Sequence, residues 1–313
     1  MTMIAFLFPG QGSQKVGMGK SLAEAHPVCR DTFAEADDAL GEPLSRLIFE
    51  GPEEALRLTE NTQPALLAHS IAAWRVLAAA GVRVDAAAGH SLGEYSAVVA
   101  AGGLGLEDAL AAVRLRGRLM QQAAPVGAGA MAAVLGLDDE QVVAACADAT
   151  AAGEGVVVAA NFNSPGQVVI AGDAAAVDRA IARCSELGAR RALPLPVSAP
   201  FHSPLMAPAR AGLEPTLREL RFAPLAFPVY RNVDAAPVAS PDEVRDGLIR
   251  QVDAPVRWRA TVERMRADGF DTFLEVGTGN VLSGLVRRID RQARCLAAGT
   301  ADSIESVVAE LMG

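Results

Sequence analysis

The sequence predicts an α/β protein in which a parallel sheet forms the core and a small βαββαβ unit interrupts it. Short apolar runs typical of buried strands end in glycine-containing loops and alternate with amphipathic or apolar helical patterns. A serine flanked by glycines directly follows one of these strands. Near the middle of the chain the order of the predicted elements changes, which indicates an inserted unit.

The first half of the core contains two predicted strands. Residues 4–8 form an apolar run ended by Pro9-Gly10-Gln11-Gly12, and residues 85–90 form a second run that leads to the glycine-flanked serine. The helical patterns of this half cover residues 63–80, 92–101 and 106–123. After the inserted unit the pattern is rich in helices, with one further strand predicted at residues 271–276, ended by Gly277-Thr278-Gly279.

The inserted unit has its own order of elements. Strands are predicted at residues 130–135, 156–161, 167–171 and 191–195, and helices at residues 138–149 and 173–187. This order is that of a ferredoxin-like subdomain. We therefore expect a large α/β catalytic core formed by residues 1–126 and 197–313, and a small ferredoxin-like subdomain formed by residues 127–196.

Composition restricts the functional class. The chain has 313 residues, 51% of them hydrophobic and 21% charged, and a formal charge of −9. Such a charge argues against nucleic acid as a partner, and no apolar run is long enough to span a membrane. The four cysteines are widely scattered, so we expect neither disulfides nor a metal site. A monomeric, cytoplasmic protein is expected.

The segment Gly89-His90-Ser91-Leu92-Gly93 has the G-x-S-x-G pattern of a nucleophile elbow, on which a serine hydroxyl is exposed between a strand and a helix. Such an elbow suits a hydrolase-like parallel-sheet core. Glycine is needed on both sides of the serine because side chains there would collide with the strand and helix. The helix after Ser91 directs free backbone N–H groups toward a developing oxyanion. An ordinary strand-to-helix turn that happens to hold a serine is the alternative.

A serine nucleophile needs a base, and the chain has four histidines. His69 lies within an apolar helical pattern and His26 lies near a helix end, so structural roles are expected for both. His90 is adjacent to Ser91 on a strand, where neighbouring side chains point to opposite faces. His202 remains, in a proline-flanked loop after the inserted unit; a surface histidine is the alternative.

The usual order of an α/β hydrolase triad does not fit this chain. The acids between Ser91 and His202 fall mostly in the inserted unit, and the H-G-G-G type of oxyanion loop is absent. The glycine-containing loop at residues 9–14 is able to offer a backbone N–H instead. Dinucleotide fingerprints starting at Gly10 or Gly277 lack their third glycine, and Gly19-Lys20 lacks the first glycine of a P-loop.

Together these motifs resemble the malonyl-CoA:acyl carrier protein transacylases of fatty acid synthesis over essentially the whole chain. Each piece is weak alone, but their combination and order are specific. The pieces are Phe8-Pro9-Gly10-Gln11-Gly12-Ser13-Gln14, Gly89-His90-Ser91-Leu92-Gly93-Glu94, Arg116-Gly117, Asn161-Phe162-Asn163-Ser164-Pro165-Gly166-Gln167, Phe201-His202-Ser203 and Glu275-Val276-Gly277.

The resemblance implies a role for each catalytic group. Ser91 would be the nucleophile that carries the acyl group, and His202 the general base and then acid. The family orients its histidine with the backbone carbonyl of a glutamine, which corresponds to Gln251. Its oxyanion donors correspond to the backbone N–H groups of Gln11 and Leu92.

Two further residues are implied to select the substrate. The family holds the substrate carboxylate with an arginine at the position of Arg116, which suits a guanidinium fork. Periodicity alone does not choose among Arg114, Arg116 and Arg118. In related polyketide acyltransferases a bulky residue at the position of Phe201 accompanies malonyl specificity.

The implied reaction transfers malonyl from malonyl-CoA to the phosphopantetheine thiol of acyl carrier protein through a malonyl-serine, with no bound cofactor and no metal. The alternatives are a serine thioesterase or esterase, and a carrier-binding transacylase subunit of a malonate decarboxylase or polyketide system.

Because carrier proteins are acidic, we expect a local basic docking patch. The favoured patch is Arg190 with Arg191. The other basic cluster consists of Arg287, Arg288, Arg291 and Arg294.

Overall fold

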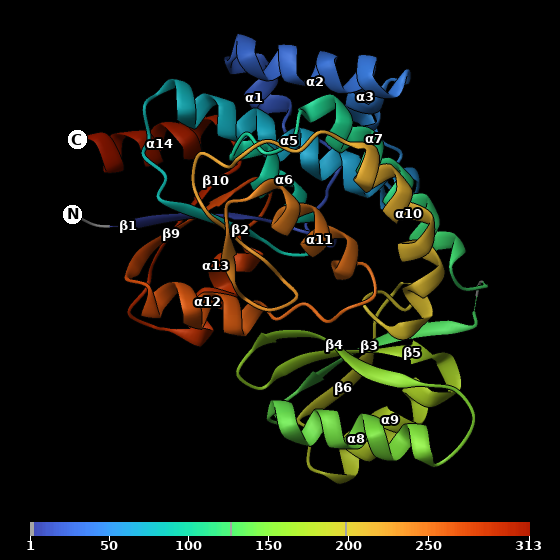
Figure 1. The fold of residues 1–313 in the computed structure, drawn as a ribbon. Coiled ribbons are helices and arrows are strands. Elements are labelled where there is room, and N and C mark those ends of the chain that lie inside the picture. Colours follow the sequence, from blue (N-terminus) through green and yellow to red (C-terminus); the bar gives the residue numbers. More distant parts are fainter. Residues whose placement is uncertain (1–2, 126, 198) are drawn as a thin grey trace.

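The computed structural model describes residues 3–125, 127–197 and 199–313 and contains two separate β-sheets (Figure 1). The strands of the larger sheet are β1 (Met3–Phe8), β2 (Ala86–Gly89), β7 (Val229–Tyr230), β8 (Pro237–Val238), β9 (Phe270–Val276) and β10 (Arg294–Ala298). Their spatial order is β10-β9-β1-β2-β7-β8. Every neighbouring pair is parallel except β7 and β8, which are antiparallel. The α/β class predicted from the sequence is confirmed.

The central strand β1 is buried on both faces. Phe6 and Phe8 belong to one hydrophobic cluster, whereas Ala5 and Leu7 belong to another. Successive side chains of a strand point to opposite faces, so helices must cover both sides of the sheet. A continuous apolar run is therefore the expected sequence of such a strand.

Helices form a layer on each face of the larger sheet (Figure 1). One layer contains α12 (Trp258–Ala267) and α13 (Val281–Ile289). The other helices of the core contribute buried residues to the larger cluster: α1 (Lys20–Ala25), α2 (Pro27–Leu40), α3 (Leu44–Glu50), α4 (Glu53–Arg57), α5 (Thr59–Ala79), α6 (Leu92–Ala100), α7 (Leu106–Gln122), α10 (Ala207–Glu219), α11 (Pro241–Gln251) and α14 (Ala301–Met312).

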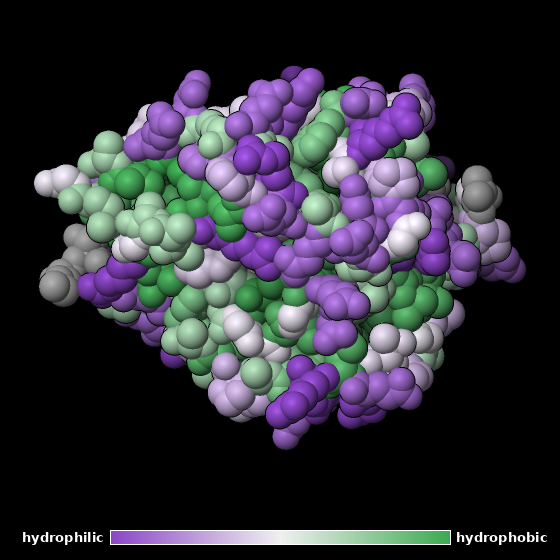
Figure 2. Space-filling view, turned by 90° about the horizontal axis from the view of Figure 1, so that it is seen from above, coloured by the Kyte–Doolittle hydropathy of each residue, from purple (hydrophilic) through white to green (hydrophobic). Residues whose placement is uncertain are grey.

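Helix α2 illustrates how an outer helix is held. It buries Cys29, Phe33 and Ala36 against the core and leaves charged residues outward. Hydrophilic residues cover much of the face seen from above this helix (Figure 2). In the part of the chain that the structure describes, no helix is both long and apolar enough to cross a membrane.

The smaller sheet is built from one continuous stretch of the chain. Its strands are β3 (Gly129–Leu135), β4 (Val157–Ser164), β5 (Gln167–Asp173) and β6 (Arg191–Pro194), in the order β4-β5-β3-β6 with all neighbours antiparallel. Helices α8 (Asp139–Ala151) and α9 (Ala174–Glu186) share a separate hydrophobic cluster with it. The predicted element order βαββαβ is thus observed.

The chain enters and leaves this stretch at one place. A Cβ on Gly129, at the start of β3, would lie 2.4 Å from Pro200 on the returning segment, so the two passages touch. The short 3₁₀ helix η1 (Pro204–Met206) follows and leads back to α10. The predicted boundary residue 126, like residue 198, lies outside the described residues.

The predicted strands and helices are found with shifts of a few residues, and three strands were not predicted. Helix α5 begins at Thr59 rather than residue 63 and contains Pro64. Strands β7 and β8 have two residues each, and β10 is an alanine-containing edge strand, so none carries a strong periodic signal.

Two glycines allow the turn between β2 and α6 to close. A Cβ on Gly89 would lie 1.9 Å from the carbonyl of Gly93, and a Cβ on Gly93 would lie 2.0 Å from the carbonyl oxygen of Phe8. Real Cβ atoms do not approach backbone this closely, so the glycines permit direct contact of β1, β2 and α6.

Gly93→Ala is expected to lower the free energy of unfolding by about 3 kcal/mol or more, because the new methyl group overlaps the backbone of a central strand. Gly284→Ala is the matched control, since a Cβ there meets nothing within 4 Å in helix α13. That control should raise stability by up to about 1 kcal/mol. Urea unfolding of both variants tests this, and equal stabilities would contradict the packing argument.

Candidate active site

The backbone of Ser91 is held in an unusual conformation between β2 and α6. Its φ is 51° and its ψ is −105°, a region that residues other than glycine rarely occupy. Its N–H donates to Oδ1 of Asn232 at 2.7 Å, and its carbonyl oxygen accepts from Nε2 of Gln251 at 2.9 Å. Both peptide groups beside the serine are therefore fixed by buried side chains.

Ser91 and His202 lie 111 residues apart but form a hydrogen bond of 2.7 Å between Oγ and Nε2. Nδ1 of His202 lies 3.0 Å from the carbonyl oxygen of Gln251 and 3.2 Å from that of Ala254. Carbonyl oxygens accept only, so the proton of a neutral imidazole resides on Nδ1 and Nε2 accepts from the serine. This is the tautomer that a general base requires.

Burial controls the charge of the histidine. His202 is 3% exposed, and burial together with the nearby charge of Arg116 lowers its pKa to about 3, against the partial opposing effect of the two carbonyl hydrogen bonds. The imidazole is consequently neutral around pH 7 and ready to accept the serine proton.

Arg116 on helix α7 reaches the same serine. Its Nη2 donates to Ser91 Oγ at 3.1 Å and to Gln251 Oε1 at 2.9 Å, and its Nη1 donates to Gln63 Oε1 at 2.8 Å. The residue is 1% exposed, and burial lowers its pKa. All three hydrogen-bond partners are uncharged, which leaves the guanidinium free to bind an anionic ligand.

The two neighbouring arginines point elsewhere. Arg114 contacts Glu42 and Asn61, and Arg118 forms an ion pair of 2.9 Å with Glu60. The structure thus distinguishes among three positions that helical periodicity left equivalent.

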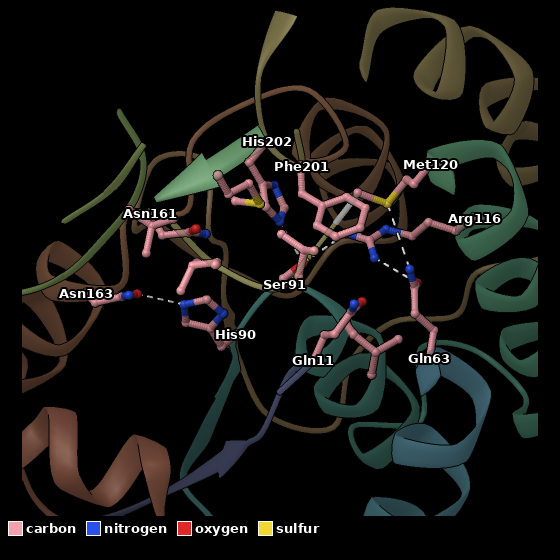
Figure 3. A pocket seen from close by; sticks show the side chains of 15 residues that line it. Gln11, Gln63, His90, Ser91, Arg116, Met120, Asn161, Asn163, Phe201 and His202 are labelled. Atoms are coloured by element: carbon pink, nitrogen blue, oxygen red, sulfur yellow. Dashed lines mark hydrogen bonds between the residues drawn. The ribbon is translucent and has the colours of Figure 1, made fainter. Parts of the chain in front are cut away.

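These groups face a cavity of about 200 Å³ (Figure 3). Gln11, Leu92 and Phe201, all singled out from the sequence, line it beside Ser91. Residues of the smaller sheet complete the wall, among them Met131 and Val169. The cavity therefore lies where the two sheets of the molecule meet.

The other histidines take no part in the Ser91–His202 hydrogen bond. His90 Nε2 lies 2.9 Å from Oδ1 of Asn163 and points away from that pair (Figure 3). His69 Nε2 lies 3.0 Å from the carbonyl oxygen of Gly299, and His26 is the N-cap residue of α2.

The sequence analysis assigned no role to three residues of the site. Gln63 binds Arg116, Asn232 binds Ser91, and Glu94 accepts hydrogen bonds from Asn232 and Gln251. Glu94 stood in a motif but had no assigned role. Asn232 follows the two-residue strand β7, where no pattern marked it.

The favoured basic patch lies on the smaller sheet. Arg190 and Arg191 are exposed, and within residues 3–125, 127–197 and 199–313 neither forms an ion pair. Arg191 on β6 lies opposite Leu135 on β3, and Leu135 lies opposite Gln167 on β5. Oε1 of Gln167 accepts a hydrogen bond from Arg288 at 2.5 Å. Arg288 of the second cluster thus lies at the same end of this sheet as Arg191.

Residues 5–309 match the acyl transferase domain family. The chain belongs to this family.

Relatives match along nearly the whole chain. It is 49% identical to the malonyl CoA-acyl carrier protein transacylase of Haemophilus influenzae over 310 residues, covering 98% of both chains. With the Escherichia coli K12 protein of the same name it shares 51% identity over 291 residues, covering 92% of this chain and 93% of the relative. With the Bacillus subtilis protein of that name identity is 46% over 311 residues, covering 99% and 98%.

Solved structures agree with the fold. An acyl carrier protein S-malonyltransferase from Vibrio cholerae superimposes with a TM-score of 0.95 at 50% identity, covering 98% of this chain and all of the other. A malonyl-transacylase in complex with its type II PKS acyl-carrier protein superimposes with a TM-score of 0.96 at 46% identity, covering 99% of this chain and all of the other.

Proposed function

We propose that this protein transfers malonyl from coenzyme A to the phosphopantetheine thiol of acyl carrier protein through a malonyl-serine. The observation that carries the proposal is the convergence of a neutral histidine and a buried arginine on the hydroxyl oxygen of Ser91. Near 50% identity to malonyl CoA-acyl carrier protein transacylases supports this reaction over hydrolysis of a thioester or a purely carrier-binding role.

In the first half-reaction His202 Nε2 takes the proton of the Ser91 hydroxyl while Oγ attacks the thioester carbonyl. The tetrahedral oxyanion lies against the backbone N–H groups of Gln11 and Leu92. The C–S bond then breaks, and the imidazolium gives its proton to the coenzyme A thiolate. The carrier thiol reverses these steps, so each half-reaction ends with a neutral histidine.

Arg116 holds the malonyl carboxylate and thereby also affects the base. In the free enzyme the positive charge of Arg116 disfavours the imidazolium of His202. Pairing with the substrate carboxylate offsets this charge, so malonyl binding makes His202 more basic. Phe201, next to the base and on the cavity wall, limits branched acyl groups. The reaction uses side chains and backbone amides alone.

We propose that residues 127–196 form a ferredoxin-like subdomain inserted into a hydrolase-like core composed of residues 1–126 and 197–313. The antiparallel order β4-β5-β3-β6 and the element order βαββαβ support this assignment. A single chain contains the whole Ser–His pair, which agrees with a monomer. The four free cysteines agree with a reducing compartment, the cytoplasm.

The carrier protein docks on Arg190 and Arg191, with Arg288 beside them. Gln167, Leu135 and Arg191 lie in register on neighbouring strands, so about 10 Å separates Arg191 from the residue that Arg288 contacts. Strand β6 continues from Arg191 toward Leu195 on the cavity wall, about 13 Å farther. An extended pantetheine arm is able to follow this path from the patch to Ser91.

Labelling with radioactive malonyl-CoA tests the function directly. The wild-type enzyme should give a rapid burst of covalent label, which leaves with the carrier thiol when carrier protein is added. Ser91→Ala should abolish the label with the fold intact, and His202→Ala should slow labelling about 10²- to 10⁴-fold. Label in the Ser91 variant, or release to water at the same rate without carrier, would contradict the proposal.

Arg116→Ala should slow acylation by malonyl-CoA about a hundredfold more than acylation by acetyl-CoA, because only malonyl loses a charged partner. Arg116→Lys should restore little, since the planar fork is absent. The competition ratio of malonyl to acetyl labelling measures this effect. An unchanged ratio would refute the assigned role.

Reversing the docking charges with Arg190→Glu and Arg191→Glu should raise the Michaelis constant for carrier protein about tenfold and weaken its salt dependence. Acylation by malonyl-CoA should change little. The matched control carries Arg46→Glu and Arg218→Glu, two exposed arginines on α3 and α10 that give the same change in net charge. Equal carrier kinetics in the two double variants would place the docking patch elsewhere.

A further inference from the structure

A buried carboxylate lies behind the serine and is not used by the mechanism above. Glu94, in the first turn of helix α6, is 2% exposed. Its Oε2 accepts hydrogen bonds from the backbone N–H of Asn232 at 2.9 Å and from Nε2 of Gln251 at 2.8 Å. Burying a carboxylate is costly unless hydrogen bonds or an opposite charge compensate for lost hydration, so this group needs an explanation.

The first connection from Glu94 leads to the serine backbone. The side chain of Asn232, whose N–H binds Glu94, accepts from Ser91 N at 2.7 Å and donates from Nδ2 to the Gly89 carbonyl oxygen at 2.7 Å. Gln251 Nε2, which also binds Glu94, donates to the Ser91 carbonyl oxygen. Glu94 thus holds the backbone of Asn232 and the side chain of Gln251, the two residues whose side chains hold the strained serine.

The second connection leads to Arg116. The side-chain amide of Gln251 lies between the two charges, because its Oε1 accepts from Arg116 and its Nε2 donates to Glu94. Glu94 is therefore a counter-charge that acts on the guanidinium through a neutral amide. A direct ion pair would occupy the donors that a substrate carboxylate needs.

Gln251 connects these groups to the base as well. Its backbone carbonyl accepts from His202 Nδ1, while its side chain binds Glu94 and Arg116. A rotation of this side chain would break its hydrogen bonds to the serine, to Arg116 and to Glu94, whereas a shift of its backbone would move the carbonyl that orients the base.

We propose that Glu94 is a positioning residue of the acyl transfer reaction: through Asn232 and Gln251 it holds Ser91 in its reactive conformation and balances the charge of Arg116 without blocking it. This inference rests on the proposed function. It predicts that removing the charge of Glu94 lowers the rate of acylation without weakening the binding of malonyl-CoA, because the charge of Glu94 has the same sign as the malonyl carboxylate.

Titration of Glu94 offers a second readout. Burial raises its pKa to about 7, although the hydrogen bonds and the charges of Arg231 and Arg116 act in the opposite direction. Tyr95, the adjacent titratable group, has its pKa raised by burial and stays neutral in this range. Protonation removes the negative charge that balances Arg116 and weakens the two hydrogen bonds that Oε2 accepts, so acylation should slow as the pH falls through about 7. In the free enzyme His202 does not produce this change, since its pKa is about 3.

The decisive comparison is between Glu94→Gln and Glu275→Gln in rapid-mixing acylation assays. Glu275 is the matched control, a fully buried carboxylate that accepts from the first backbone N–H groups of α13, at Leu282 and Ser283. Glu94→Gln should slow acylation at least tenfold with both malonyl-CoA and acetyl-CoA, while the apparent dissociation constant for malonyl-CoA does not rise. Glu275→Gln should acylate at the wild-type rate per folded molecule, measured by active-site titration.

Wild-type rates between pH 5.5 and 8.5 supply an independent measurement if Glu94→Gln does not fold. The rate should decline on the acid side with a midpoint near 7, and the decline should be absent from Glu94→Gln where that variant folds. A flat wild-type profile, or equal acylation rates in Glu94→Gln and wild type, overturns the inference. Failure of wild-type protein to acquire any malonyl label would instead overturn the proposed function.

Discussion

Direct contact of three backbone segments is the constraint on which the active site depends. Glycines at positions 10, 89 and 93 allow the end of β1, the end of β2 and the start of α6 to touch without intervening side chains; a Cβ on Gly10 would lie 2.3 Å from the His90 carbonyl oxygen. This contact places Ser91 at the carboxyl edge of the parallel sheet and at a helix N-terminus at once. The serine acquires its exposed hydroxyl from packing rather than from its own conformational preference.

Neutral side-chain amides separate the charged groups of the site, and this separation determines its electrostatics. Gln63 and Gln251 bind Arg116 without neutralising it, and carbonyl oxygens rather than a carboxylate orient His202. A carboxylate in place of these carbonyl oxygens would favour the imidazolium form of the histidine, as in hydrolase triads. The two carbonyl oxygens orient the imidazole of His202 but stabilise its positive charge less than a carboxylate would. The base therefore remains neutral beside the buried Arg116.

The sequence predicted those parts of the protein that depend on local pattern. The elbow and strand β1 each have a signature within a few residues, and the βαββαβ order follows from six such local patterns in succession. Elimination among four histidines led to His202. The choice of Arg116 over Arg114 could not be made locally, because it depends on which face of α7 meets α5 and the elbow. Asn232 was beyond reach for the same reason: its partner is Ser91, 141 residues earlier.

The contact between Gly129 and Pro200 has a mechanical consequence. The chain enters and leaves the four-stranded sheet at one place, and strand β4 is fixed to the core a second time, because the backbones of Ala160 and Phe162 hydrogen-bond with that of Val256 at 2.9 Å. Pro200 precedes His202 by two residues, and the same returning segment carries Leu195 and Phe201 on the cavity wall. The wall of the cavity and the position of the base therefore depend on the same segment of the chain, so a displacement of the small sheet would change both together.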